Sequence, residues 1–244
     1  GEVGLSTLRT WENLGLTSWR SGWEAGDSFL SFKCGPPLGH TWRDMVLAGD
    51  PDVQEMGYAH QHPNAGSFIY YPEGTPVTTT PLYTTPKRTA LENTWTFRPT
   101  PAVERSWTIQ EASASFGWDP ESFVEDLGDP SLLGQAGDWQ MWFGSIDTLL
   151  DNGDHAQLLA SAEESDVVFM AGEFAGVYDQ NYRSSEGESP LPLDAVVRTL
   201  TRLPSGVLVV LDRVETSAPM PAQAWFRNHT SPWTVDGSSA TLNA

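Results

Sequence analysis

Two histidines separated by one residue, His60 and His62, form the densest group of chemically capable side chains in this sequence. Side chains of an extended segment alternate between its two faces, so both imidazoles would point to the same side. Two imidazoles on one face can ligate a metal ion together, or one can bind the ion while the other transfers a proton. Histidines that only make structural hydrogen bonds can have the same spacing. The residues around the pair must therefore indicate whether it has a functional role.

The residues around this pair predict β-strands. Apolar, aromatic and β-branched runs are bounded by turn-forming Gly and Pro, as in Gly35-Pro36-Pro37 and Pro72-Glu73-Gly74. Strands are expected at 27–34, 67–71 and 93–97, and residues 75–80 are expected to continue as an extended, β-branched run. Residues 39–44 between them are expected to form a loop or a short turn.

The second half of the chain predicts more strands. A buried strand is expected at 166–172, a hairpin at 196–203 and 207–214, and a further strand at 222–228. Residues 155–163 are expected to form a short helix, and residues 101–165 as a whole are expected to be long acidic connections within the sheet domain. Many strands without alternating helices predict an all-β fold, a large antiparallel β-sandwich with long loops and little helix, as one domain over 1–244.

Charge excludes some partners. The chain has 32 acidic and 13 basic residues, a net charge of −19, which is unsuited to nucleic acid. No apolar run approaches the roughly 18 residues of a membrane-spanning helix.

An acidic polysaccharide would need locally clustered cations, and Lys33, Arg43, Lys87, Arg88 and Arg98 all lie in the first hundred residues. Clustered, they could bind uronate or sulfate groups; scattered, they are solvated surface charges.

Two further features bear on compartment and reactivity. Cys34 is the single cysteine, so an internal disulfide is excluded, and its apolar surroundings favour a buried, inert thiol. Asn228-His229-Thr230 is a glycosylation sequon, so Asn228 is a candidate glycan acceptor. The sequon favours a protein of the secretory-pathway lumen or the extracellular space.

Several segments resemble one family in the same order along the chain. Trp11-Glu12-Asn13 and residues 29–35 resemble the opening of the sandwich domain in dermatan-sulfate epimerases, and residues 60–68 resemble their His-x-His-Pro-Asp-x-x-Ser-Phe motif. Segments 74–76, 82–83, 168–173 and 208–212 follow in the expected order. The chain is therefore similar to the dermatan-sulfate epimerase and heparinase II/III-like group over most of residues 10–235, weakly through 101–165.

That resemblance implies a larger enzyme. Members of the group join an N-terminal α/α toroid to a C-terminal antiparallel sandwich (supersandwich-like) and bind sugar between them. The chain would then be a sandwich fragment whose toroid, with its own catalytic histidine and tyrosine, lies in the rest of the polypeptide or in a partner subunit. The implied activity is a chondroitin-glucuronate 5-epimerase-like isomerase or a polysaccharide lyase acting on glycosaminoglycan, and the fragment alone would be inactive.

The resemblance also implies roles for particular residues. His60 matches the catalytic histidine of the sandwich, and Tyr83 matches an active-site tyrosine. His62 and Asn93 match ligands of a divalent metal such as Mn, Ca or Zn. Among the clustered cations, Arg43, Lys87 and Arg88 are the candidates for binding the anionic substrate.

Two positions depart from the family pattern. Thr80 stands where the family has an acidic metal ligand, and a hydroxyl is a poor substitute on a hard divalent cation. Asn64 replaces the aspartate of the motif, which removes a negative charge that could orient a histidine. Glu92 carries a carboxylate close to Asn93 in sequence, but strand alternation would point its side chain to the face opposite that of Asn93.

These departures keep a second hypothesis open. The chain could be a non-catalytic extracellular module, structural or carbohydrate-binding, that derives from the family. An unrelated β-sandwich carrying the motif by chance is a third possibility, which the ordered series of similar segments makes less probable.

Overall fold

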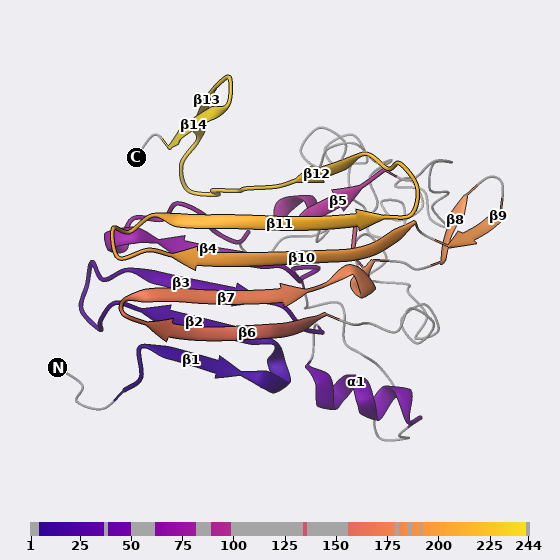
Figure 1. The fold of residues 1–244 in the computed structure, drawn as a ribbon, viewed down its shortest axis with the longest axis horizontal. Helices are drawn as coiled ribbons and strands as arrows, with labels where there is room; N and C mark the ends of the chain where they lie inside the picture. Colours follow the sequence, from indigo (N-terminus) through magenta and orange to yellow (C-terminus); the bar gives the residue numbers. More distant parts are fainter. Residues whose placement is uncertain are drawn as a thin grey trace, which may run out of the picture.

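Two antiparallel four-stranded sheets face each other and form a sandwich (Figure 1). The computed structural model describes residues 5–36, 39–49, 62–81, 89–98, 134–135, 156–178, 181–184, 187–190 and 192–242. One sheet has the order β1-β2-β3-β4, formed by Leu8–Trp11, Leu16–Arg20, Phe29–Lys33 and Ser67–Tyr71. The other has the order β11-β10-β7-β6, formed by Leu208–Thr216, Leu193–Arg202, Val167–Glu173 and Gln157–Glu164. The all-β sandwich expected from the sequence is thereby confirmed.

Smaller elements surround the two sheets. Two-stranded pairs are formed by β12 with β5 (Ala222–Ala224 with Trp95–Phe97), β13 with β14 (Trp233–Asp236 with Ser239–Leu242) and β8 with β9 (Asn181–Ser184 with Gly187–Pro190). The helical elements are α1 (His40–Leu47) and the short η1 (Glu12–Leu14), η3 (Pro72–Gly74), η4 (Thr89–Leu91) and η5 (Ala175–Val177). Of the helices in the described ranges, none has the length and apolar character that a membrane crossing requires.

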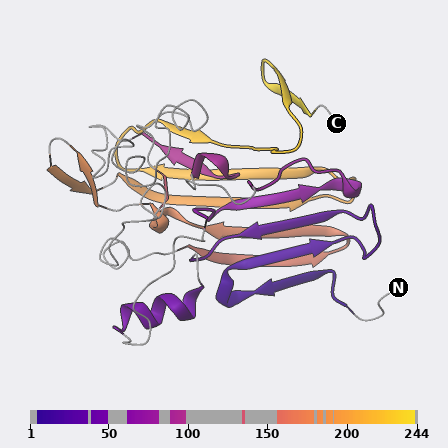
Figure 2. The same cartoon turned by 180° about the vertical axis from the view of Figure 1, so that it is seen from behind.

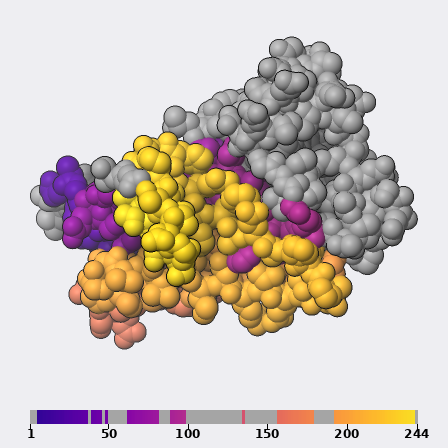
Figure 3. Space-filling model, turned by 90° about the horizontal axis from the view of Figure 1, so that it is seen from above, coloured from indigo at the N-terminus to yellow at the C-terminus, as the bar shows by residue number. Residues whose placement is uncertain are grey.

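Segments distant in sequence meet along one side of the sandwich. Strand β12 pairs with β5, so the C-terminal part of the chain lies beside residues from its middle. Figure 3 shows this neighbourhood in space-filling form, with the yellow C-terminal residues against purple ones. This contact brings Arg227 and His229 next to the segment that precedes β5.

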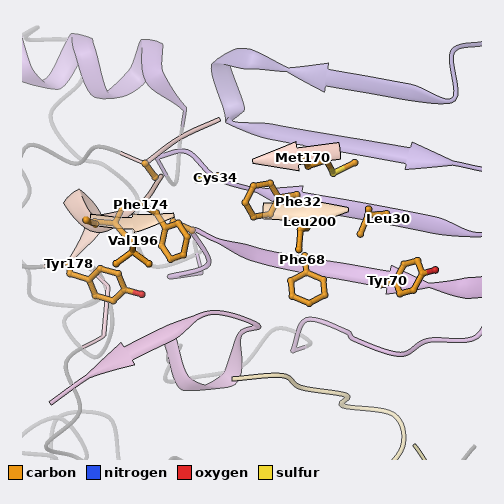
Figure 4. Packing of buried hydrophobic residues seen from close by; sticks show 14 of the residues in the cluster. Leu30, Phe32, Cys34, Phe68, Tyr70, Met170, Phe174, Tyr178, Val196 and Leu200 are labelled. Atoms are coloured by element: carbon orange, nitrogen blue, oxygen red, sulfur yellow. The ribbon is translucent and has the colours of Figure 1, made fainter. Parts of the chain in front are cut away.

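The core lies between the two sheets (Figure 4). Alternation along β3 and β4 points Leu30, Phe32, Phe68 and Tyr70 inward, and all four are buried. The facing strands β7 and β10 contribute four further buried side chains, Val168, Met170, Val196 and Leu200. Burial of each large apolar side chain contributes about 1.5–3 kcal/mol, so this interlayer packing is the main source of stability.

The sheets approach each other closely at Cys34 and Gly172. A Cβ atom on Gly172 would lie 2.4 Å from the Cys34 Sγ atom, so only glycine fits opposite the thiol. The thiol is fully buried, and burial raises its pKa to about 12. The expectation of a buried cysteine is confirmed.

Cys34 is therefore expected to be unreactive in the folded protein. A thiol reagent added at pH 9 should find no thiolate, because the folded pKa lies near 12 and the sulfur is inaccessible. Denaturant should release one reactive thiol per chain, since the sequence has one cysteine. The absorbance of the anion that the reagent releases measures the amount of reacted thiol, both in the native protein and in denaturant. Full reaction in native buffer, at the rate of the unfolded chain, would contradict the packing described here.

Two expectations about secondary structure were wrong. Residues 155–163 do not form a helix, because Gln157–Glu164 is strand β6 and pairs with β7. Its local sequence favours a helix, but pairing and contacts with the facing sheet outweigh that preference. Residues 39–44 are not a loop, because His40–Leu47 is helix α1. Its first turn is capped from a distance, since the Asn13 Oδ1 atom accepts hydrogen bonds from the Thr41 backbone N–H and hydroxyl.

Candidate functional site

A buried carboxylate holds His62. The Nδ1 atom of His62 lies 2.9 Å from Glu92 Oε1, and the Ser67 hydroxyl lies 3.5 Å from Glu92 Oε2. The Glu92 side chain is 0% exposed, whereas that of His62 keeps 19%. When Glu92 is ionised its oxygens only accept hydrogen bonds, so Nδ1 carries the proton and Nε2 the lone pair. Nε2 has no hydrogen-bond partner among the described residues.

The position of Glu92 differs from the expectation. Alternation along a strand was expected to point it away from the site, but β5 begins only at Trp95 and Glu92 lies in a bend before it. Its carboxylate supplies next to His62 the negative charge that Asn64 does not carry. Glu92, which strand geometry had excluded from the site, is thus the direct partner of His62.

Asn93 joins three segments of backbone. Its Nδ2 donates to the carbonyls of Phe68 and Thr79, at 3.0 and 2.9 Å, and its Oδ1 accepts from the Arg227 backbone N–H. The side chain is fully buried. In this arrangement the amide holds β4, the 79–80 segment and the C-terminal segment together.

The described residues do not assemble a metal site. The Asn93 Oδ1 atom, through which an amide binds a cation, already accepts the Arg227 backbone N–H, and Thr80 offers a hydroxyl in place of a carboxylate. Within the described ranges no group of three or more His, Cys, Asp or Glu side chains is close enough to hold an ion. His62 and Asn93 as metal ligands therefore stay a prediction, and no chemistry below depends on a metal.

Arg198 is the buried cation behind the site. Its Nε and Nη2 atoms donate to the two carboxylate oxygens of Asp212 at 2.7 and 2.8 Å, and its Nη1 donates to the carbonyls of Gly66 (2.7 Å) and Asn93. The Arg198 side chain is 0% exposed and its guanidinium lies 5.4 Å from the centre of the Phe68 ring. Strands β10 and β11 are thereby tied to both segments that carry the His62–Glu92 pair.

Sequence reasoning missed Arg198, although a signal was present. Arg198 and Asp212 are direct cross-strand partners in the β10–β11 hairpin. Counting outward from the Pro204-Ser205-Gly206 turn would have paired these opposite charges. Their burial could not be foreseen, because an arginine in a strand is usually on its exposed face.

Gly66 shapes the loop between His62 and β4. Its φ is +76°, which favours glycine, and an added Cβ would lie 2.3 Å from the Phe174 ring. Its backbone N–H donates to the Lys33 carbonyl, and its own carbonyl accepts from Arg198. The glycine of the histidine motif is thus required for the close approach of backbone and ring.

The remaining predicted site residues are only partly placed. Arg43 lies on α1 and forms an ion pair with exposed Asp44 at 2.7 Å. The Lys33 ammonium donates to the backbone carbonyls of Leu14, Gly35 and Pro36 at 2.6, 2.8 and 3.0 Å. The donors of the Lys33 ammonium therefore bind backbone carbonyls and not a ligand. Four predicted residues lie outside the described residues: His60, Tyr83, Lys87 and Arg88.

Asn228, the candidate glycan acceptor, is engaged at both ends of its amide. Nδ2 donates to the carbonyls of Pro76 and Val77, at 2.7 and 3.2 Å. Oδ1 accepts from the Thr230 backbone N–H and hydroxyl and from the Ser231 N–H. A glycan on Nδ2 would replace one of these hydrogens, so attachment before folding would alter this turn. Glycosylation here stays a prediction.

Comparison with known proteins adds little to this geometry. No family model matches the chain. A solved structure of heparinase III is similar with a TM-score of 0.46 and 15% sequence identity, over 94% of this chain and 26% of that one. The chain thus spans about a quarter of the length of that protein. A TM-score of this size is below the level at which a shared fold follows.

Proposed function

We propose that this chain is the β-sandwich part of an enzyme that removes the C5 proton of uronates in acidic polysaccharides. The observation that supports this most is the His62–Glu92 pair within the motif that resembles the epimerase and lyase family. A buried carboxylate on Nδ1 fixes the ring and leaves the lone pair on Nε2, as in histidines that bind metals or transfer protons.

The chemistry begins beside the substrate carboxylate. A base takes the C5 proton, and the electron pair of the C–H bond moves into an enolate-like system that a positive or hydrogen-bonding neighbour stabilises. In epimerisation, an acid returns a proton to C5 from the opposite face. In elimination, the C4–O bond breaks instead, a C4–C5 double bond forms, and the leaving oxygen takes up a proton.

The roles are divided between described and undescribed residues. His60 is proposed as the sandwich histidine that handles the proton, and Tyr83 as its assistant. His62, two positions from His60, is proposed to lie in the same site with its Nε2 towards the substrate. Glu92 and Asn93 are proposed to position the segment, since each is buried and hydrogen-bonded on both sides.

A second candidate is a non-catalytic module that retains the sandwich. The Asn93 Oδ1 atom, which already accepts a hydrogen bond from the Arg227 backbone, and the hydroxyl at Thr80 favour it, because both weaken the ligand set that the family resemblance implies. Elemental analysis of purified protein separates the two in part. A stoichiometric divalent metal would support the enzyme, and its lack would support the module.

Solvent-isotope exchange tests the proposed activity directly. The complete protein is incubated in D2O with chondroitin or dermatan sulfate, and deuterium at C5 of the uronates is measured by NMR or mass spectrometry. An epimerase is expected to incorporate deuterium at C5 with inverted configuration. A lyase leaves no hydrogen on C5 and is recognised instead by an unsaturated chain end. The His60→Ala variant is expected to lose the exchange while keeping its circular dichroism. Exchange at the wild-type rate in this variant would refute the assignment of His60.

A further inference from the structure

The sheet formed by β1–β4 differs in charge from the rest of the chain. Acidic residues outnumber basic ones 32 to 13 in the whole sequence. The four strands nevertheless contain Arg9, Arg20 and Lys33 and not one aspartate or glutamate. A cationic sheet in a protein of net charge −19 indicates a local requirement for positive charge.

The strand register places these residues on the outward face. Trp19, Leu30, Phe32 and Phe68 point into the core, so their neighbours along each strand point outward. The outward side chains form three rows across the sheet: Arg9–Ser18–Ser31–Ile69, Arg20–Phe29–Tyr71 and Trp11–Leu16–Lys33–Ser67. Figure 2 shows β1, β2 and β3 from this side, with no described element drawn across them.

Both exposed arginines lie over aromatic rings. The Arg9 guanidinium is 5.0 Å from the centre of the Trp11 ring, and that of Arg20 is 5.1 Å from Trp23 and 5.0 Å from Phe29. Neither guanidinium group has a hydrogen-bond or ion-pair partner among the described residues. Stacking fixes the plane of a guanidinium but leaves its N–H edges free for a bidentate anion.

One acidic group at the border of this face, Asp27, is directed away from it. Asp27, which follows the Trp23 loop, accepts hydrogen bonds from the Ser21 hydroxyl and the Glu24 backbone N–H. Its carboxylate is thus used within its own loop. Trp23 remains 43% exposed, so an aromatic surface is available beside Arg20.

We propose that the outward face of β1–β3 is a binding surface for acidic polysaccharide. Arg9 and Arg20 bind carboxylate or sulfate groups, Trp11, Trp23 and Phe29 pack against the apolar faces of the sugar rings, and the serines between them hydrogen-bond to hydroxyl groups. Strand spacing puts the Cα atoms of Arg9 and Arg20 about 8 Å apart, so one chain can contact both.

This surface is a separate site from the His62–Glu92 pair, and it does not depend on the C5 chemistry. The two nevertheless share a sheet. The row that begins at Trp11 ends at Ser67, whose hydroxyl contacts Glu92, about 14 Å across the four strands. A polysaccharide held on the face could therefore remain close to the candidate site between encounters.

Binding of chondroitin sulfate to the full chain tests the proposal, with isothermal titration or biolayer interferometry as the readout. Arg9→Gln/Arg20→Gln removes both charges and keeps side chains of polar character. Arg213→Gln is the matched control, because Arg213 is an exposed arginine on β11, in the opposite sheet. The double variant is expected to bind about tenfold more weakly, the control within about twofold of wild type, and raised salt should weaken wild-type binding.

Three results would overturn the proposal. They are an unchanged affinity in the double variant, an equal loss in Arg213→Gln, and equal binding of uncharged dextran, which would indicate a neutral-glycan surface. The same comparison in a His62→Ala background separates the two sites. The loss caused by the double substitution should persist there, even if the C5 chemistry is later disproved.

Discussion

Replacing Arg198 with leucine is expected to lower the free energy of unfolding by about 3–5 kcal/mol. The substitution leaves the Asp212 carboxylate without its bidentate partner and removes the donor shared by the Gly66 and Asn93 carbonyls. Buried polar groups without partners cost far more than the pair itself contributes. Urea denaturation followed by tryptophan fluorescence measures the change.

Two companion variants separate loss of a partner from loss of charge. Arg198→Leu/Asp212→Leu removes both charges, so it should recover part of the stability lost in the single variant. Arg213→Leu changes an exposed arginine of the neighbouring strand and should stay within about 0.5 kcal/mol of wild type. A loss below about 1 kcal/mol in Arg198→Leu would show that the guanidinium does not hold the site together.

Replacing His62 with alanine in the complete protein is expected to reduce uronate C5 exchange by about 10²-fold, because the segment that carries His60 loses the contact with Glu92 that positions it. The substitution removes the partner of the fully buried Glu92 carboxylate and should lower the free energy of unfolding, so the rate is measured at a temperature at which circular dichroism shows the variant folded. The measurement is the initial rate of deuterium incorporation at saturating polysaccharide.

His229 provides the matched control for this variant. It is an exposed histidine whose Nε2 lies 2.9 Å from the Leu91 carbonyl, next to Glu92 in sequence but not bonded to it. His229→Ala should leave the exchange rate within about threefold of wild type, as expected for a surface substitution without a catalytic contact. If both variants lose activity equally, the loss reflects disturbance of the 89–94 segment rather than the chemistry of His62.

The sequence predicted the strands that alternate strongly or are continuously apolar. β3, β4, β7 and the β10–β11 hairpin were all expected within a few residues of their observed bounds. Their patterns are clear because one face of each strand lies in the core. β6 was mistaken for a helix, since its Ala- and Glu-rich sequence shows no alternation and its conformation is set by β7.

The candidate site was only partly predictable, because its decisive contacts are between segments distant in sequence. The histidine motif drew attention to His62, but its partner Glu92 is 30 residues away and lies in a bend that strand rules do not describe. Arg198 is 132 residues from the Gly66 carbonyl that it binds. Buried polar networks of this kind depend on tertiary packing, which local pattern does not encode.

The tautomer of His62 tests the role of Glu92 most directly. Nitrogen-15 NMR of the imidazoles, in mildly alkaline buffer, distinguishes a protonated Nδ1 from a protonated Nε2. In wild type we predict the proton on Nδ1, shared with Glu92, and in Glu92→Ala a mixture weighted towards Nε2. A proton on Nε2 in wild type, or identical spectra for the two proteins, would contradict the claim that the buried carboxylate orients this histidine.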